Sequence, residues 1–354
     1  MNLHRDYSAL DRDGVRFEPD PARPLALFAP DPEYRPTAVL EVEPEPRFRL
    51  LIKNETSRLG LPAFKALGGI YAVSRLVGER WYRETGEHLP VAELNRPDVR
   101  RFAGRLTFVC ASAGNHGLAV ARGARRIGAS ARVHLAETVP EAFVERLAGE
   151  GAEVRRSGSD YEASVDVAMQ DAESSGAMLL ADGSWPGYLD PPALVMEGYT
   201  LIAEELREGF ARNSAWPDRV YLQAGVGGLA AAMTYMIRSN WPVQPEVIVV
   251  EPEAAPCLRE SHSAGRLVRV HGPESVMGRL DCKVPSLLAL DVLGRSADRF
   301  ITVSDTAAER AVERLGQFGV ATTPSGAAGL AGVLGDGGFA HGRRSLILAT
   351  EASV

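Results

Sequence analysis

The residue of this sequence best suited to covalent chemistry is Lys65, in the apolar, glycine-flanked segment LPAFKALGGI. The chain has 39 lysine and arginine residues, but only Lys53, Lys65 and Lys283 are lysine. Arginine stays protonated in proteins, whereas burial lowers the pKa of a lysine and leaves a nucleophilic amine. Lys65 is therefore the candidate for amine chemistry. We expect Lys53 to be a solvated or paired structural residue and Lys283 to lie in a loop on the substrate side.

A second candidate is the turn CASAGNHG, residues 110–117, which follows an expected strand and precedes an expected helix. Small residues at such a turn expose successive backbone N–H groups, a shape that receives an anion such as a carboxylate. Asn115 adds a neutral amide at the same place. The alternative is a tight turn in which Asn115 only caps the helix, and the turn by itself does not decide between the two.

The third candidate is the turn QAGVGGLA, residues 223–230, again between a strand and a helix. Glycines allow a phosphate to approach the backbone closely, and the helix dipole favours its charge. The segment also fits G-x-G-x-x-A, and Glu251 follows near the ribose-binding position of a dinucleotide site. The local pattern does not separate a dinucleotide from the phosphate of a single cofactor, and a packing turn is a third possibility.

A serine opens the last long helix, in the segment TTPSGAAGL. The hydroxyl of this residue, Ser325, can cap the helix or can point at a ring nitrogen of a ligand. Taken alone, the capping role is the simpler interpretation.

Composition narrows the classes of function. The chain of 354 residues has a net charge of -7 and no long basic run, which argues against a nucleic-acid partner. The N-terminus lacks the apolar core of a signal peptide, and we interpret Tyr221–Ile237 as a buried strand, turn and helix rather than a membrane span. Cys110, Cys257 and Cys282 suit free thiols in a reducing cytoplasm, and no CxxC or HExxH motif supports a metal site.

These candidate turns lie in an alternation of β-rich runs and segments with a helical apolar period, after an N-terminal arm of about 48 residues. The expected strands are Leu106–Ala111, Ala131–Leu135, Ala152–Arg156, Ala177–Ala181, Val220–Gln223, Val247–Glu251, Phe300–Val303 and Ser345–Ala349. The expected helices are Gly117–Ile127, Glu141–Gly149, Tyr161–Ser174, Pro192–Glu208, Leu229–Ser239, Thr306–Phe318 and Ser325–Leu334. This order predicts an α/β fold with open, mostly parallel sheets flanked by helices, and ligands at the carboxyl ends of the strands.

One lysine, an Asn loop, a glycine loop and a late serine, in this order, resemble the fold-type II pyridoxal-phosphate enzymes. This is the tryptophan synthase β-like family, which includes threonine and serine dehydratases and cysteine synthase. The blocks NETSRLGLPAFKALGGIYA, GYLDPPALVMEGY and MGRLDCKVPS are similar to those of the diaminopropionate ammonia-lyases in particular. Together with the blocks GNHG, QAGVGG and PSGAAGL, they extend from about residue 50 to residue 335.

The resemblance implies two domains with pyridoxal 5′-phosphate between them. Residues 1–68 and 184–354 would form a large cofactor-binding domain, and residues 69–183 a small inserted domain that carries the Asn loop. It also implies a small-molecule amino-acid substrate, a homodimer in the cytoplasm, and no nucleic-acid or membrane partner.

The resemblance further implies a role for each matching residue. Lys65 would bind the cofactor covalently and remove the Cα proton of the substrate, and Asp182 would protonate or orient the leaving amine. The residues expected to hold the cofactor are Lys65, Phe64 beside the ring, Asn115 at its 3′-oxygen, Ser325 at its pyridine nitrogen, and Gly225, Val226, Gly227, Gly228 and Leu229 around its phosphate. The residues expected to frame the substrate carboxylate are Ser112, Ala113, Gly114 and His116.

Two departures from the family pattern bear on the reaction. Ammonia-lyases of this kind usually carry an acid before GNHG, where this chain has Ala113, so we expect loss of activity on D-isomers. The sequence ends at ATEASV, where the family typically continues through a loop beside the ring, and we expect a more open site.

The predicted function is a pyridoxal-phosphate-dependent lyase that eliminates a β-leaving group from an L-amino acid. The simplest substrate is L-2,3-diaminopropionate, giving pyruvate and ammonia. Alternatives that keep the cofactor are a β-replacement synthase and an L-serine or L-threonine dehydratase. Two other classes stay open, a nicotinamide-dependent oxidoreductase and a binding protein without catalytic activity.

Overall fold

The computed structural model describes residues 16–45, 48–112, 114–159, 161–337 and 343–353. The strands are Val39–Val42 (β1), Arg49–Asn54 (β2), Thr107–Ala111 (β3), Ser130–Leu135 (β4), Glu153–Arg156 (β5), Met178–Leu179 (β6), Arg219–Gln223 (β7), Glu246–Pro252 (β8), Arg299–Val303 (β9) and Arg344–Ala349 (β10). The helices are Ala22–Phe28 (α1), Lys65–Thr85 (α2), Pro97–Ala103 (α3), Asn115–Ile127 (α4), Glu141–Gly149 (α5), Tyr161–Ser175 (α6), Asp190–Asn213 (α7), Gly228–Asn240 (α8), Cys257–Ala264 (α9), Leu287–Ser296 (α10), Asp305–Gln317 (α11) and Pro324–Gly335 (α12), with a 3₁₀ turn at Val91–Glu93 (η1).

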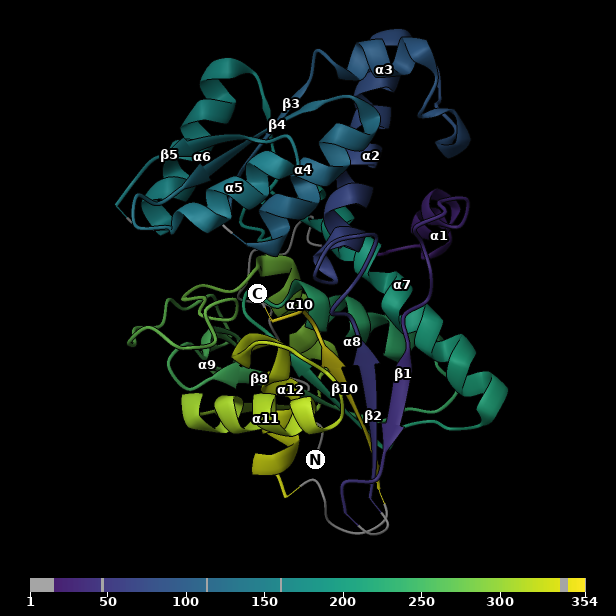
Figure 1. Cartoon of the computed structure of the whole chain (residues 1–354), viewed down its shortest axis with the longest axis vertical. Coiled ribbons are helices and arrows are strands. Elements are labelled where there is room, and N and C mark those ends of the chain that lie inside the picture. Colours follow the sequence, from purple (N-terminus) through teal and green to yellow (C-terminus); the bar gives the residue numbers. More distant parts are fainter. Residues whose placement is uncertain (1–15, 46–47, 113, 160, 338–342, 354) are drawn as a thin grey trace.

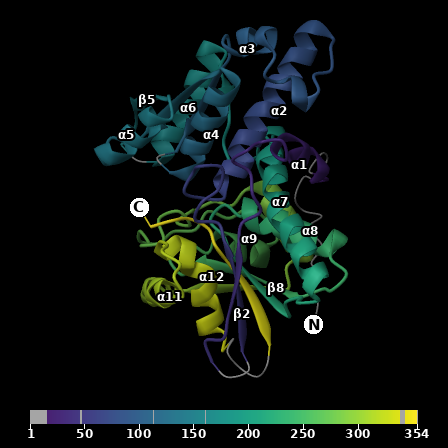
Figure 2. The same cartoon turned by 45° about the vertical axis from the view of Figure 1, so that its right-hand side comes forward.

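Two sheets organise these elements. The larger has the order β1-β2-β10-β7-β8-β9, and all its pairs are parallel except β1 with β2. The smaller has the order β5-β4-β3-β6 and is parallel throughout. Figures 1 and 2 show the sheets in opposite halves of the molecule, with helices on their faces. The predicted α/β class with two mostly parallel sheets is confirmed. The antiparallel edge strand β1 lies in the segment that the sequence predicted to be an extended arm.

Helix α2 begins at the candidate lysine and runs from the larger half into the smaller one (Figure 1). It ends at Gly86, whose φ of 74° is a left-handed conformation that glycine adopts without strain. The sequence analysis did not predict this helix of 21 residues. Two consecutive glycines and a preceding proline argued against a helix in this segment, because glycine is unfavourable inside helices.

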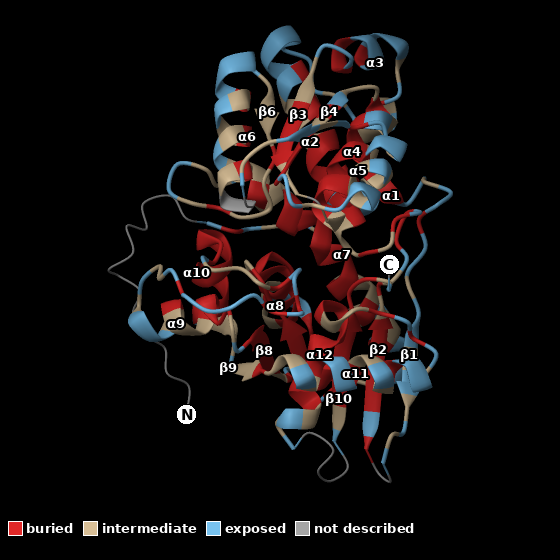
Figure 3. Ribbon diagram, turned by 60° about the vertical axis from the view of Figure 1, so that its left-hand side comes forward, coloured by how far each residue is buried: buried red, intermediate tan, exposed pale blue. Residues whose placement is uncertain are grey.

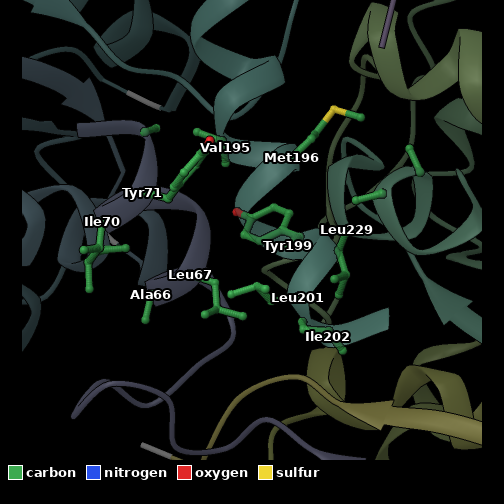
Figure 4. Packing of buried hydrophobic residues seen from close by; sticks show 14 of the residues in the cluster. Ala66, Leu67, Ile70, Tyr71, Val195, Met196, Tyr199, Leu201, Ile202 and Leu229 are labelled. Atoms are coloured by element: carbon green, nitrogen blue, oxygen red, sulfur yellow. The ribbon is translucent and has the colours of Figure 1, made fainter. Parts of the chain in front are cut away.

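The two glycines are explained by close helix crossings. A Cβ atom on Gly69 would lie 2.5 Å from the Cβ of Ala119 in α4, and one on Gly68 would lie 2.4 Å from Cε1 of Tyr199 in α7. Gly198 of α7 meets the Leu67 carbonyl oxygen in the same way. Figure 4 shows side chains of both helices near this crossing, among them Leu67 of α2 and Tyr199 of α7. The start of α2, and with it Lys65, is therefore fixed between two other helices.

A buried ionic network anchors the segment that leads to Lys65. Arg58 and Lys53 donate to the Glu205 carboxylate at distances of 2.7 and 2.6 Å, and Arg58 also donates to Glu55. Burial lowers the pKa of Arg58, but Glu55 and Glu205 more than offset burial, so its pKa is above the ordinary value. Of the two states expected for Lys53, solvated or paired, the structure shows the paired one, since its amine contacts Glu205. Removing one partner of such a network leaves an uncompensated buried charge.

Buried residues concentrate where the helices face the sheets and where α2, α4 and α7 cross, as the red segments of Figure 3 show. Helices α3, α6 and α11 each have one face of exposed residues. Within the described ranges, no helix combines the length and the apolar composition that crossing a bilayer requires.

The glycine crossing makes a stability prediction. We expect Gly68→Ala to destabilise the protein by about 1–3 kcal/mol, because its methyl group would overlap Tyr199 and the Val195 carbonyl oxygen. The matched control is Gly78→Ala in the same helix, where a Cβ meets nothing within 4 Å. The control should raise stability by about 0.5–1 kcal/mol. Equal unfolding midpoints for the two variants in urea would contradict the packing argument.

Candidate active site

The predicted site residues converge on one cavity of about 440 Å³ between the two sheets. It is formed by the start of α2, the turn between β3 and α4, the turn between β7 and α8, and the start of α12. The predicted residues that line it are Phe64, Lys65, Ser112, Gly114, Asn115, His116, Asp182, Gly225, Val226, Gly227, Gly228, Leu229 and Ser325. Ala113, the remaining predicted residue, lies outside the described residues.

At the centre of the cavity, Lys65 Nζ donates a hydrogen bond to Asp182 Oδ2 at 2.7 Å. Burial lowers the pKa of the Lys65 amine, but the neighbouring Asp182 carboxylate more than offsets burial, and the pKa is raised above its ordinary value. The same pairing lowers the pKa of Asp182, although burial alone would raise it. The expectation of a lowered Lys65 pKa is wrong for this arrangement, because the sequence did not indicate that a carboxylate faces the amine.

Two aromatic rings flank the amine. Lys65 Nζ lies 5.2 Å from the centre of the Phe64 ring and 5.9 Å from that of Tyr199, and the two rings meet edge to face. Burial raises the pKa of Tyr199 to about 12, so its hydroxyl stays neutral. This hydroxyl is buried and has no hydrogen-bond partner among the described residues. The rings supply an apolar wall beside the amine.

The turn between β3 and α4 presents a polar edge to the cavity. Gly114 N–H donates to Ser112 Oγ at 3.2 Å, and the Asn115 side-chain amide donates to Glu351 Oε2. Among the described residues no side chain caps the N-terminus of α4, so its first backbone N–H groups are available to an anion. The Asn115 amide has two N–H donors, so one remains for a ligand beside the one that is donated to Glu351.

His116 is engaged just beneath this turn. Its Nε2 atom lies 2.8 Å from the Leu180 carbonyl oxygen, and the ring is buried. Burial lowers the pKa of His116, which keeps the ring neutral. A neutral ring donates from Nε2 to the carbonyl, so His116 ties α4 to the segment that carries Asp182.

The turn between β7 and α8 forms a cradle of backbone groups. Gly227 has a φ of 100°, and a Cβ on Gly225 would lie 2.9 Å from Cys282 Sγ, so glycine is needed at both positions. In the part of the chain that the structure describes, no side chain caps the N-terminus of α8. Its N–H groups and the helix dipole favour an anion such as a phosphate.

At the opposite side of the cavity, Ser325 Oγ accepts a hydrogen bond from the Arg279 backbone N–H at 3.1 Å. Ser325 does not cap α12, which was one of its two possible roles. The cap is Thr323, whose hydroxyl accepts from Gly326 N–H. The Ser325 hydroxyl hydrogen is thus free to be donated into the cavity.

Two other sequence candidates have structural partners. The Lys283 amine donates to the Ala254 and Pro273 carbonyl oxygens and to Asp281 Oδ1, at 3.1, 3.1 and 2.5 Å. The Glu251 carboxylate accepts from the backbone N–H groups of Leu258 and Arg259 at 2.7 and 2.8 Å. Since both of its oxygens cap α9, Glu251 is not poised for a ribose, which argues against the dinucleotide interpretation.

Sequence reasoning missed Glu351 and Arg279. The Glu351 carboxylate accepts from the Thr323 hydroxyl at 2.5 Å and from Asn115, so it joins both sides of the cavity. The sequence did carry a signal for Glu351, because an acid two residues after a buried strand lies near the carboxyl end of a parallel sheet. Arg279 lies in the irregular segment between α9 and α10, where no local pattern marks a site residue.

Comparison with known proteins agrees with this geometry. The family model "Pyridoxal-phosphate dependent enzyme" matches residues 31–351. The chain belongs to this family. Diaminopropionate ammonia-lyase of Escherichia coli strain K12 is 32% identical over 326 residues, covering 89% of this chain and 80% of that protein. A holo crystal structure of the Escherichia coli enzyme superposes with a TM-score of 0.81 at 27% identity, covering 95% of this chain and 91% of the other. Human L-serine dehydratase/L-threonine deaminase is 28% identical over 250 residues, covering 69% of this chain and 73% of that protein.

The cofactor of this pyridoxal-phosphate-dependent enzyme fits the cavity on the chain's own features. Three independent groups suit its three polar ends: the uncapped N-terminus of α8 for a phosphate, the Ser325 hydroxyl for a ring nitrogen, and the Asn115 amide for a ring oxygen. Lys65 is the only lysine among the described residues that line the cavity, and a Cβ atom at Gly225 or Gly227 would fill the glycine cradle.

The burial of Glu251 makes a prediction about pH. Burial raises the pKa of Glu251 from the ordinary 4.5 to about 7, although two backbone N–H groups lower it in part. Between these values the folded state binds more protons than the unfolded state, so the contribution of Glu251 to stability falls as pH rises. We expect the melting temperature of the parent minus that of Glu251→Gln to decrease between pH 4.5 and pH 7. Above pH 7 this difference should stay level. A difference that stays constant across this range would contradict the assigned burial.

Proposed function

We propose that this enzyme eliminates ammonia from L-2,3-diaminopropionate, yielding pyruvate and two molecules of ammonia after addition of water. The observation that carries the proposal is the contact of 2.7 Å between the Lys65 amine and the Asp182 carboxylate inside the glycine-cradled cavity. The similarity to diaminopropionate ammonia-lyases over most of the chain supports the choice of substrate.

The chain's own residues would hold the cofactor as follows. The N–H groups of Gly225 to Leu229 would bind its phosphate, Asn115 its 3′-oxygen and Ser325 its pyridine nitrogen, with Phe64 beside the ring. When bound, pyridoxal phosphate supplies an aldehyde for an amine and a ring that withdraws electrons from the substrate Cα. Ser325 is a neutral hydroxyl, so it does not hold a positive charge on the ring nitrogen as a carboxylate would. This limits electron withdrawal and favours prompt loss of a β-leaving group.

Lys65 and Asp182 would carry the protons. Once free of the proton that Asp182 stabilises, the Lys65 amine would take the proton from the substrate Cα, because it is the only lysine amine among the described residues that line the cavity. Asp182 lies within hydrogen-bonding distance of that amine, so a proton on Lys65 can pass to the carboxylate. Asp182 then delivers it to the leaving β-amine, which departs as ammonia. His116 holds the segment of Asp182 through the Leu180 carbonyl oxygen.

A second candidate function is an L-serine dehydratase, favoured by the similarity to the human dehydratase. β-Replacement, in which a nucleophile captures the elimination product, also remains a proposal. The assembly of acidic groups around the cavity, Asp182, Glu274, Asp281 and Glu351, favours a substrate with two amines over one with a hydroxyl.

Two further proposals follow from the family resemblance, a homodimer and a cytoplasmic location. Cys110, Cys257 and Cys282 are free thiols in the structure, which agrees with a reducing compartment. We also propose residues 69–183 as the small domain, since β3, β4, β5 and β6 of the smaller sheet all lie within it.

An amino-acid panel with pyruvate readout tests the function. We expect L-2,3-diaminopropionate to be turned over with a higher kcat/KM than its D-isomer or L-serine. Asp182→Asn should lower kcat by about 10²–10⁴-fold, the usual contribution of a positioned acid or base. The control is Glu208→Gln on the exposed face of α7, which should behave as the parent. Absence of pyruvate from diaminopropionate, with turnover of L-serine alone, would replace the proposal by the dehydratase.

A further inference from the structure

Arg279 is a charged residue of the catalytic cavity. It has no role in the mechanism proposed above. Its side chain is 34% exposed and lines the same cavity as Lys65 and Asp182. Its position is fixed from two sides. The backbone N–H donates to Ser325 Oγ, and the guanidinium lies over the Phe143 ring of α5, 5.4 Å from its centre.

The guanidinium of Arg279 forms one long ion pair, with Glu351. Glu351 Oε2 lies 3.7 Å from Arg279 Nε, beyond hydrogen-bonding distance, and that carboxylate already accepts from Asn115 and Thr323. Among the residues that the structure describes, no side-chain N–H of Arg279 donates a hydrogen bond. A guanidinium has five donors in a planar fork that matches a carboxylate. Arg279 is therefore held in place with its binding capacity unused.

The guanidinium lies against the turn that precedes α4. A Cβ atom on Gly114 would be 3.4 Å from Arg279 Nε and 3.5 Å from its Cζ. Gly114 is the N-cap residue of α4, and no side-chain cap satisfies the first backbone N–H groups of this helix among the described residues. Two independent sources of positive potential thus meet at one edge of the cavity. The Asp182 carboxylate and the Lys65 amine lie in the same cavity.

We propose that Arg279 is a specificity-determining residue that binds the α-carboxylate of the amino-acid substrate, together with the N-terminus of α4. This role of Arg279 adds a substrate-binding residue to the proposed function. It rests on that function only in that the ligand is an amino acid. The arrangement orients the substrate, because its carboxylate is held by Arg279 while its amines face Lys65 and Asp182. Phe143 acts as a positioning residue through its contact with the guanidinium, and Glu351 lies 3.7 Å from Arg279 Nε.

The test uses the holoenzyme and a probe that cannot lose a β-group. L-Alanine binding is followed through the change that it causes in the visible absorption of the holoenzyme, and L-alaninamide serves as the analogue without a carboxylate. We expect Arg279→Gln to weaken L-alanine binding by about 10–100-fold, the usual effect of losing a charged hydrogen-bonded pair. Binding of L-alaninamide and of the cofactor should be unchanged, and Arg279→Lys should fall between parent and Gln.

The matched control is Arg146→Gln. Arg146 stacks on the same Phe143 ring, 5.9 Å from its centre, but does not line the cavity. It should bind L-alanine as the parent does. The inference is overturned if Arg279→Gln binds L-alanine as tightly as the parent, or if it weakens both probes equally. Since L-alanine is not turned over by elimination, these outcomes do not depend on whether diaminopropionate is the substrate.

Discussion

The Lys65 amine and the Asp182 carboxylate lie 2.7 Å apart, and the rest of the structure maintains this distance. Lys65 opens α2, which is locked between α4 and α7 by glycine contacts. Asp182 follows β6 of the other sheet and is tied to α4 by His116. The pair brings a cationic hydrogen-bond donor and an anionic acceptor together in a site flanked by aromatic rings. Water is a poor competitor there, so the pairing decides the charge of both groups.

The cavity separates charges of opposite sign. The uncapped starts of α4 and α8 provide positive potential where a carboxylate and a phosphate are expected. The acids Asp182 and Glu351 come from segments that follow strands of the two sheets, β6 and β10. Glu351 also joins the sides of the cavity, because it accepts from Asn115 on α4 and from Thr323 before α12. A substrate with one carboxylate and two amines is complementary to this distribution.

Much of this arrangement could be predicted from the sequence because parallel strands bring their carboxyl ends to one edge. The turns with Asn115, Gly225–Leu229 and Ser325 follow strands or open helices, so the alternation of elements placed them in one cavity. Helix α2 was missed because Gly68 and Gly69 serve a tertiary crossing that no local period records. Arg279 was missed because it lies in an irregular segment. The raised pKa of Lys65 could not be predicted locally, because its partner Asp182 lies 117 positions away in the sequence.

The most direct test of the account is to identify the amine that binds the cofactor. The holoenzyme is reduced with borohydride, digested and mapped by mass spectrometry. With only three lysines in the chain, the result is unambiguous. The account predicts that the cofactor-derived mass appears on the peptide with Lys65 alone, and that Lys53 and Lys283 remain unmodified because each is engaged by other residues. Label on either of those lysines, or no label at Lys65, would contradict it.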